Sequence, residues 1–266
     1  MKKLSMSIGL VLVLAVTAAP VLAITWGLPD TEHKNVGAMV VDWPSYGPFQ
    51  ACSGTLVHPR VFLTAGHCTE GWEGTGVETF WVNFDRYALK EATLLEVEQV
   101  ITHPDYYWGP TSDPHDVGVL ILAKPVRRIT PARLPTEGYL NDLNAAGLLG
   151  RGADKAKFTV VGYGGTLNWP PPDIYYDDYR QFAVSEFRSL LGAWLRLSQN
   201  PATGDGGTCA GDSGGPAFWT EEDGDEILVG ITSWGDPNCM SAGFNYRVDI
   251  PETLSFIQAV IDGLED

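Results

Sequence analysis

Three short motifs in this chain carry residues that could act as a nucleophile, its base and the group that orients the base. Ser213 lies in the run Cys209–Pro216, which reads Cys-Ala-Gly-Asp-Ser-Gly-Gly-Pro. A nucleophilic serine needs a sharp backbone turn that projects its hydroxyl, and glycines on both sides permit one. His67 ends the run Leu-Thr-Ala-Gly-His, and Asp116 precedes the apolar run 117–122. Alone, the serine motif would also be consistent with a glycine-rich turn.

These residue types suit acyl transfer. Serine is a weak nucleophile unless a base removes its proton, and an imidazole that titrates near neutral pH is a suitable base. His67 would be that base for Ser213, while Asp116 would hold the imidazole in one tautomer. His67 could instead be structural or bind a metal, and Asp116 could be a turn residue, but the three motifs together favour catalysis. The pattern assigns no role to His115, which precedes Asp116.

The order of the motifs, His67, Asp116 and then Ser213, resembles the chymotrypsin/trypsin family of serine peptidases, from about Ile24 to the C-terminus. The resemblance implies an all-β fold of two antiparallel Greek-key β-barrels with a C-terminal helix, a secreted serine endopeptidase activity and an active site between the barrels. It also implies an oxyanion hole formed by the backbone N–H groups of Gly211 and Ser213. A catalytically silent binding module on the same fold is the alternative. An esterase elbow is disfavoured because it needs the opposite residue order and a βα setting.

The resemblance also implies where a substrate binds. Gly207, followed by Thr208, would lie at the base of the primary pocket, which takes the side chain before the scissile bond. Without a carboxylate at this base, we expect a preference for a large apolar side chain. Asp236 could place a carboxylate near the pocket mouth, and Asn245 stands where the family often has an aromatic residue. The other implied binding residues are Ser233 and Trp234 in the strand that binds the substrate backbone, and Gly235 and Gly243 as open pocket walls.

Residues 1–23 are typical of a secretory signal peptide, with two lysines, an apolar core and a Val-Leu-Ala cleavage site. A membrane anchor is the rival interpretation, but the apolar part is short and Pro20 interrupts it. In the family, an exposed N-terminal ammonium pairs with the aspartate before the nucleophile. Here that pair would be Ile24 and Asp212, unless Asp212 is simply a polar turn residue. Cleavage after Ala23 would then create the functional N-terminus directly, without a propeptide.

Four cysteines in an exported chain suggest two disulfides with three possible connectivities, and spacing alone does not choose among them. The resemblance implies the pairs Cys52–Cys68 and Cys209–Cys239. The first would tie a strand to the His67 loop, and the second would tie the Ser213 loop to the far wall of the primary pocket.

Charge and motifs also limit the partners. The formal charge of −16 should repel nucleic acid and anionic membranes. We therefore expect protein or peptide substrates and a monomer that leaves the membrane after signal cleavage. No motif supports a catalytic metal, so we expect no cofactor. Some family members bind calcium in the loop that corresponds to residues 70–78, but its acids Glu70, Glu73 and Glu78 are consistent with a solvated surface.

The expected domains are the signal peptide (1–23) and one peptidase domain (24–266). Within the peptidase domain we expect barrel one at about 24–130, barrel two at about 131–250 and a helix at about 251–264, which has one apolar face. Two long loops, 105–114 and 166–178, could form rims of the substrate groove. Short runs rich in Val, Ile, Leu, Phe and Tyr predict strands at 37–41, 51–57, 79–84, 94–101, 117–122, 157–163, 180–185, 193–197, 227–234 and 243–248.

Overall fold

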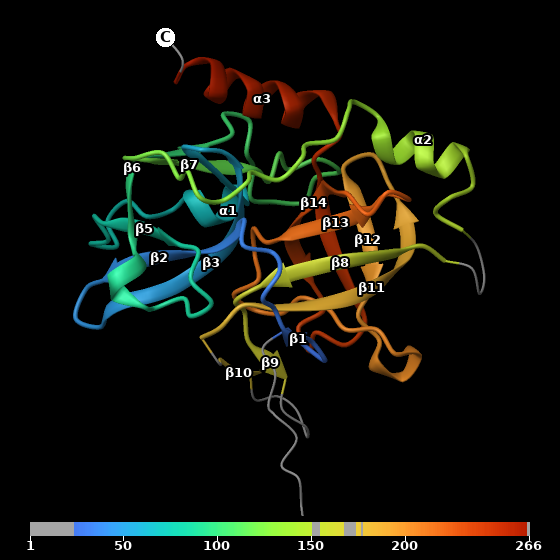
Figure 1. The fold of residues 1–266 in the computed structure, drawn as a ribbon, viewed down its shortest axis with the longest axis horizontal. Coiled ribbons are helices and arrows are strands. Elements are labelled where there is room, and N and C mark those ends of the chain that lie inside the picture. The colour runs from blue at the N-terminus through green and yellow to red at the C-terminus, as the bar shows by residue number, and fades with distance from the viewer. Residues whose placement is uncertain (1–23, 151–154, 168–173, 177, 265–266) are drawn as a thin grey trace, which may run out of the picture.

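Two closed antiparallel β-barrels, each of six strands, lie side by side in the computed structural model (Figure 1). The structure describes residues 24–150, 155–167, 174–176 and 178–264, so the predicted signal peptide lies outside the described residues. The blue-to-green barrel contains the N-terminal strands, and the yellow-to-red barrel contains the C-terminal ones (Figure 1). The prediction of an all-β, two-barrel fold with a C-terminal helix is confirmed.

Barrel one closes in the order β2-β3-β4-β7-β6-β5. Strand β4 was not among the predicted strands, because it has only four residues and follows β3 after a short turn. All four of its residues are buried, and it pairs with both β3 and β7, so it is central to the wall from which His67 extends. The strands are β2 (Val36–Trp43), β3 (Gly47–His58), β4 (Val61–Thr64), β5 (Phe80–Asn83), β6 (Leu95–Thr102) and β7 (Gly118–Leu122).

Barrel two follows the order β11-β12-β15-β14-β13-β8, and pairing of β8 with β11 closes it. Strand β13 was also not predicted, since its first residue, Pro216, belongs to the glycine-rich serine motif. The N-terminal strand β1 pairs with β11, which attaches the start of the chain to this barrel. The strands are β1 (Leu28–Pro29), β8 (Lys157–Gly162), β11 (Gln181–Leu190), β12 (Trp194–Ser198), β13 (Pro216–Thr220), β14 (Glu226–Gly235) and β15 (Ala242–Arg247).

Few helices accompany the barrels. The predicted C-terminal helix is α3 (Pro251–Asp262), whose Phe256 ring packs against His103 at 4.9 Å between centroids, just after β6. No described helix is long and apolar enough to cross a membrane. The region 166–178, expected to be a loop, contains a small two-stranded sheet. The remaining elements are α1 (Gly66–Thr69), α2 (Tyr139–Ala145), the 3-10 helices η1 (Glu91–Thr93) and η2 (Pro201–Thr203), β9 (Thr166–Leu167) and β10 (Ile174–Tyr175).

Candidate active site

His67 is held at the end of barrel one by a short helix and a disulfide. Strand β4 leads directly into α1, which contains His67 and Cys68. Cys68 is bonded to Cys52 on β3, as the family resemblance implies. The Trp72 indole N–H donates to the Cys68 carbonyl at 2.8 Å. These contacts fix the backbone on both sides of the imidazole and leave its ring partly exposed.

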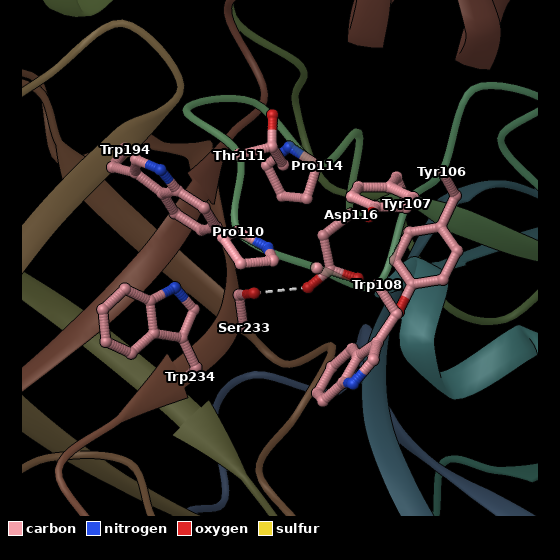
Figure 2. Close-up of a pocket in the computed structure, with 11 residues that line it drawn as sticks. Tyr106, Tyr107, Trp108, Pro110, Thr111, Pro114, Asp116, Trp194, Ser233 and Trp234 are labelled. Atoms are coloured by element: carbon pink, nitrogen blue, oxygen red, sulfur yellow. Dashed lines mark hydrogen bonds between the residues drawn. The ribbon is translucent and has the colours of Figure 1, made fainter.

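Asp116 holds His67 through both its ring and its backbone. Its carboxylate lies 3.0 Å from His67 Nδ1 and accepts the His67 backbone N–H at 2.9 Å. The Ser233 hydroxyl donates to Oδ2 of the carboxylate, the same oxygen that lies 3.0 Å from His67 Nδ1 (Figure 2). Burial alone would raise the pKa of Asp116, but the His67 contacts outweigh burial and lower the pKa. The carboxylate is therefore ionised at neutral pH and can accept the Nδ1 proton, which leaves Nε2 free as a base.

Ser213 lies on a tight loop that is docked against the strand leading to His67. Its flanking residues Gly211 and Gly214 have φ angles of +94° and +82°, which non-glycine residues rarely adopt. A Cβ placed on Gly214 would lie 2.0 Å from Thr64 Oγ1 and 3.0 Å from the Ala65 amide nitrogen. Residue 214 must therefore be glycine, because its φ angle is positive and because there is no space for a Cβ atom. It lets the loop approach the residues that immediately precede α1.

His67 and Asp116 are hydrogen-bonded to each other, and Ser213 lies in the loop that docks against the residues just before His67. Among the described residues, no hydrogen bond joins the Ser213 hydroxyl to His67. Catalytic hydrogen bonds are often loose before substrate binds and tighten in the complex. The Ser213 carbonyl accepts the Ser53 N–H at 2.8 Å, and the Gly214 N–H donates to Thr232 at 2.7 Å. The backbone of the loop is therefore fixed to both barrels.

The expected oxyanion-hole donors are unoccupied within the described part of the chain. Neither the Gly211 nor the Ser213 backbone N–H donates a hydrogen bond there. The Gly211 carbonyl, in contrast, accepts from the Gln50 side-chain amide at 2.9 Å and from the Ser53 hydroxyl at 3.1 Å. These two contacts hold the Gly211 carbonyl toward barrel one. Two free N–H groups beside a nucleophile can stabilise an oxyanion.

Asp212 is a fully buried carboxylate directly before Ser213. It accepts the Gly164 N–H at 2.7 Å and the Cys209 N–H at 2.8 Å. Burial raises its pKa to about 7, although these two N–H groups oppose the rise. No cationic side chain among the described residues pairs with it. The site is therefore short of one positive charge.

Ile24 is fully buried in the apolar core of barrel two. The next residue, Thr25, accepts the Gly207 N–H at 3.0 Å, so the chain start runs beside the loop that precedes Ser213. Cys209 in that loop is bonded to Cys239, the second pair that the resemblance implies. The structure thus places Ile24 inside the same barrel as Asp212. Among the described residues, no hydrogen bond or ion pair joins Ile24 to Asp212.

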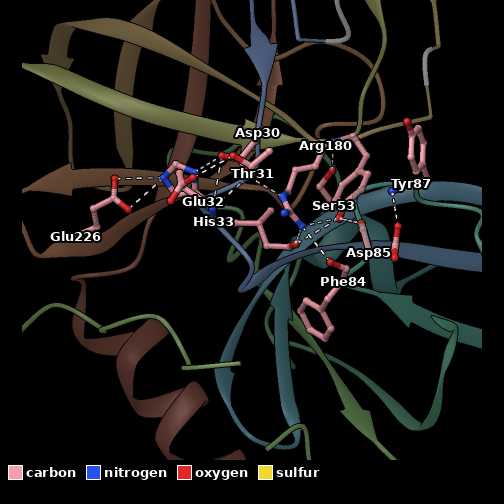
Figure 3. Close-up of polar contacts among 12 residues, drawn as sticks. Asp30, Thr31, Glu32, His33, Ser53, Phe84, Asp85, Tyr87, Arg180 and Glu226 are labelled. Atoms are coloured by element: carbon pink, nitrogen blue, oxygen red, sulfur yellow. Dashed lines mark hydrogen bonds and ion pairs between the residues drawn. The ribbon is translucent and has the colours of Figure 1, made fainter. Parts of the chain in front are cut away.

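A buried ionic network around Asp30 and His33 anchors the N-terminal segment a few residues after Ile24 (Figure 3). The Arg180 guanidinium donates to Asp30 at 2.7 Å and to the carbonyls of Val36 and Phe84, each at 3.1 Å. His33 bonds Asp30 through Nδ1 at 2.5 Å and lies 3.1 Å from Glu226 through Nε2. Burial alone would lower the pKa of His33, but its two acidic partners raise it to about 9. Sequence motifs gave no signal for this network.

The expected primary pocket is a cavity of about 200 Å³ beside Ser213. Its predicted base residue, Gly207, carries no carboxylate, but the space beside it is occupied. A Cβ on Gly207 would lie 2.3 Å from Gln199 Cγ, so the Gln199 side chain fills the space beneath the pocket. Gly243 also lies against Gln199 rather than forming an open wall. Four of the predicted binding residues line the cavity beside Ser213, namely Thr208, Ser233, Trp234 and Gly235.

Two departures from the family pattern have structural explanations. The Asp236 carboxylate lines the cavity but accepts backbone N–H groups from Asn238, Met240 and Ser241 at 2.6 to 3.0 Å. It therefore stabilises its own loop. Asn245 is buried on β15, and its side-chain oxygen accepts the Thr232 hydroxyl at 3.3 Å.

A larger aromatic cavity of about 420 Å³ lies on the other side of Asp116 and Ser233 (Figure 2). The long loop 105–114 lines it, and Trp234 and Trp194 form its opposite side. Trp234 is stacked on Phe244 at 3.7 Å between ring centroids. Sequence reasoning missed Trp194, although its indole and the aromatic run Tyr-Tyr-Trp in the loop were visible signals.

The described residues contain one close group of three potential metal ligands, Cys52, His67 and Cys68. Both cysteines are used in the disulfide, so the group does not constitute a metal site. The acids of the 70–78 loop do not converge to ligand distance within the described part of the chain. His115, which had no predicted role, stacks on His103 at 4.9 Å.

Comparisons with known proteins agree with this geometry. A family model described as Trypsin matches residues 27–257. Trypsin from Phaedon cochleariae is 29% identical over 223 residues, which cover 74% of this chain and 76% of that protein. Trypsin from Saccharopolyspora erythraea is 28% identical over 200 residues, covering 70% and 76%. Kallikrein-12 from Homo sapiens is 28% identical over 227 residues, covering 79% and 78%. The chain belongs to the trypsin family of serine peptidases.

Proposed function

We propose that this protein is an endopeptidase that cleaves peptide bonds through an acyl-enzyme on Ser213. His67 takes the Ser213 proton at Nε2 as the hydroxyl oxygen attacks the substrate carbonyl carbon. The resulting oxyanion is bound by the N–H groups of Gly211 and Ser213. The protonated imidazole then gives its proton to the leaving amine. Water repeats the sequence to release the acid and restore the free hydroxyl.

One observation supports this proposal most strongly, namely the way Asp116 binds His67. Its buried carboxylate meets the Nδ1 atom and the backbone N–H of His67, at 3.0 and 2.9 Å. A structural histidine needs no such double contact with an ionised group. The contact selects the tautomer with a basic Nε2 and stabilises the imidazolium that forms when Ser213 reacts. A silent binding module would have no use for this arrangement.

The substrate chain would lie along Ser233–Gly235 with the primary side chain in the cavity beside Ser213. We propose a preference for large, largely apolar primary side chains, because the described cavity walls carry no free carboxylate. The aromatic cavity beyond Trp234 would take further apolar side chains on the same side of the scissile bond. The triad chemistry needs no cofactor, and we expect the enzyme to act as a monomer.

The N-terminus completes the proposed mechanism. We expect secretion, with signal cleavage after Ala23, and pairing of the new Ile24 ammonium with Asp212. Two observations support this pairing: Ile24 is already buried in barrel two, and Asp212 lacks a cation. A salt bridge there would fix the loop that presents both oxyanion donors. The enzyme would then be exported in its active form.

Profiling of a mixed peptide library with the secreted protein tests the proposal. We expect internal cleavage after large apolar residues, and we expect Ser213→Ala to abolish cleavage while leaving the thermal unfolding midpoint unchanged. Cleavage by Ser213→Ala at the wild-type rate would contradict the nucleophile assignment. N-terminal sequencing of the active protein should read Ile-Thr-Trp-Gly. An active enzyme with another N-terminus would contradict the activation step alone.

A further inference from the structure

Gln199 replaces the missing side chain at the base of the primary pocket. It follows β12 and is only 2% exposed. A Cβ built on Gly207 would lie 2.3 Å from its Cγ and 3.0 Å from its Cδ. Its amide therefore occupies the position that a side chain at residue 207 would have taken. The pocket has a polar group at its base, contributed by a residue far from the serine motif.

The orientation of this amide follows from its contacts. Nε2 lies 2.6 Å from the Thr208 carbonyl oxygen and 3.1 Å from Thr208 Oγ1. A backbone carbonyl can only accept a hydrogen bond, so the atom facing it must be the NH2 group. The amide carbonyl oxygen, Oε1, must then face the other way, toward Gly235. A Cβ on Gly235 would lie 3.5 Å from it.

Oε1 of Gln199 is buried and has no hydrogen-bond partner among the described residues. Thr208, which Gln199 contacts, and Gly235, which lies in front of Oε1, both line the pocket. Gln199 itself is not one of the lining residues, so its amide lies directly behind these two residues at the base of the cavity. Buried acceptors without a donor are unfavourable, so a donor at the end of the substrate side chain would satisfy the site.

We propose that Gln199 is a specificity-determining residue that selects primary side chains with an apolar body and a neutral hydrogen-bond donor at the tip, tyrosine above phenylalanine. This inference rests on the proposed peptidase function and refines its substrate class. A phenol that enters between Thr208 and Gly235 donates its O–H to Oε1, while its ring lies beside Gly235. Phenylalanine leaves the acceptor unpaired. Lysine and arginine are disfavoured, because Asp236, the carboxylate that lines the described cavity, is already bound by three N–H groups of its own loop.

Matched substrates test the donor requirement on the wild-type enzyme. One peptide is made with tyrosine, 4-aminophenylalanine, phenylalanine or 4-fluorophenylalanine before the scissile bond, and kcat/KM is measured for each. The first two carry a neutral donor, and the fluorine is similar in size to a hydroxyl but donates nothing. We expect the two donor-bearing peptides to be cleaved about ten-fold faster or more. Equal kcat/KM values for tyrosine and 4-fluorophenylalanine would overturn the inference.

Two variants assign the effect to Gln199. Gln199→Met keeps the length of the side chain and removes the acceptor, so the tyrosine-to-phenylalanine ratio should fall to about one or below. Gln181→Met is the matched control, because Gln181 is also a fully buried glutamine with an unpartnered amide, on β11 and away from the pocket. It should keep the wild-type ratio. An unchanged ratio in Gln199→Met, or an equal loss in Gln181→Met, would contradict the assignment.

Covalent labelling of Ser213 by a fluorophosphonate separates failure of this inference from failure of the proposed function. Labelling without a donor preference refutes the role of Gln199 and leaves the peptidase proposal intact. A wild-type protein that is neither labelled nor active refutes both. If Gln199→Met does not fold and is not labelled, the wild-type comparison of tyrosine with 4-fluorophenylalanine decides the inference by itself.

Discussion

Asp212 should make the unprocessed chain lose stability as the pH rises. Its carboxyl is fully buried, and burial raises its pKa from 3.8 to about 7 in a chain whose Ile24 nitrogen is still an amide. The folded state then holds the proton more tightly than the unfolded state. The contribution of Asp212 to stability is therefore greatest below pH 3.8 and falls until about pH 7. The difference between the two pKa values corresponds to a loss of about 4 kcal/mol.

Processing should remove this loss. When the chain begins at Ile24, the new ammonium can pair with Asp212 and lower the pKa of its carboxyl. Asp212→Asn then has different effects in the two chains. In the unprocessed chain it abolishes the loss between pH 4 and pH 7, at a cost of about 1–3 kcal/mol at every pH for one unsatisfied backbone N–H. In the mature chain it leaves a buried ammonium unpaired, which costs about 3–5 kcal/mol.

Urea unfolding of four proteins tests this reasoning, all in a Ser213→Ala background that prevents self-cleavage. The proteins begin at Ala23 or at Ile24, each with and without Asp212→Asn, and the free energy of unfolding is measured from pH 4 to pH 8. Asp249→Asn is the matched control, because Asp249 is equally buried but pairs with Arg247. If Asp212→Asn leaves the pH dependence of the longer chain unchanged, Asp212 is not the uncompensated charge that we describe.

Three further predictions address the triad, the primary pocket and the N-terminal network. Asp116→Asn should lower kcat by about 10⁴ on an amide substrate, because tautomer control of the base is lost; near-wild-type turnover would contradict the triad. Gly207→Asp alone should be strongly destabilising in thermal unfolding, because its Cβ would lie 2.3 Å from Gln199 Cγ. Combined with Gln199→Ala it should fold and cleave after lysine or arginine, and continued exclusion of those residues in a library profile would refute this pocket geometry. His33→Phe should lower the free energy of unfolding by about 3 kcal/mol at pH 6 but not at pH 9.5. Because the pKa of His33 rises from 6.5 to about 9 on folding, its protonation stabilises the folded state fully below pH 6.5, and this contribution is lost as the pH rises through about 9. Parallel stability curves for wild type and His33→Phe between pH 6 and 9.5 would rule out this contribution.

The sequence predicts elements well where the pattern is local. The apolar run that forms β7 follows a polar loop, and the helical spacing after Pro251 marks α3 directly. Strand β4 has only four residues, so no periodicity could be established. Strand β13 begins with Pro216, which belongs to the glycine-rich serine motif. Because that motif is typical of a turn, the sequence did not predict a strand there. Helix α2 lies in a glycine-rich stretch, where a seven-residue helix gives little periodic signal.

Motif order located the candidate triad, because each member lies in a distinctive local run. The pocket base was harder to predict. Gly207 indicated a base without a carboxylate, but the sequence does not show that the Gln199 side chain occupies the space beside it. Gln199 reaches the pocket only because β12 pairs with β15 and ends beside Gly243. The available signal was a polar residue, Gln199, directly after a strand with alternating apolar positions. This pattern does not show which residues the Gln199 side chain contacts.

Mass-spectrometric mapping of a covalent inhibitor tests the central claim most directly. The mature protein is treated with a fluorophosphonate while hydrolysis of a peptide substrate is followed in the same sample. We predict one adduct per chain, located on Ser213, with activity falling in proportion to labelling, and no adduct on His67→Ala, which lacks the base. Labelling at another serine, or full peptide hydrolysis after complete modification of Ser213, would contradict the account.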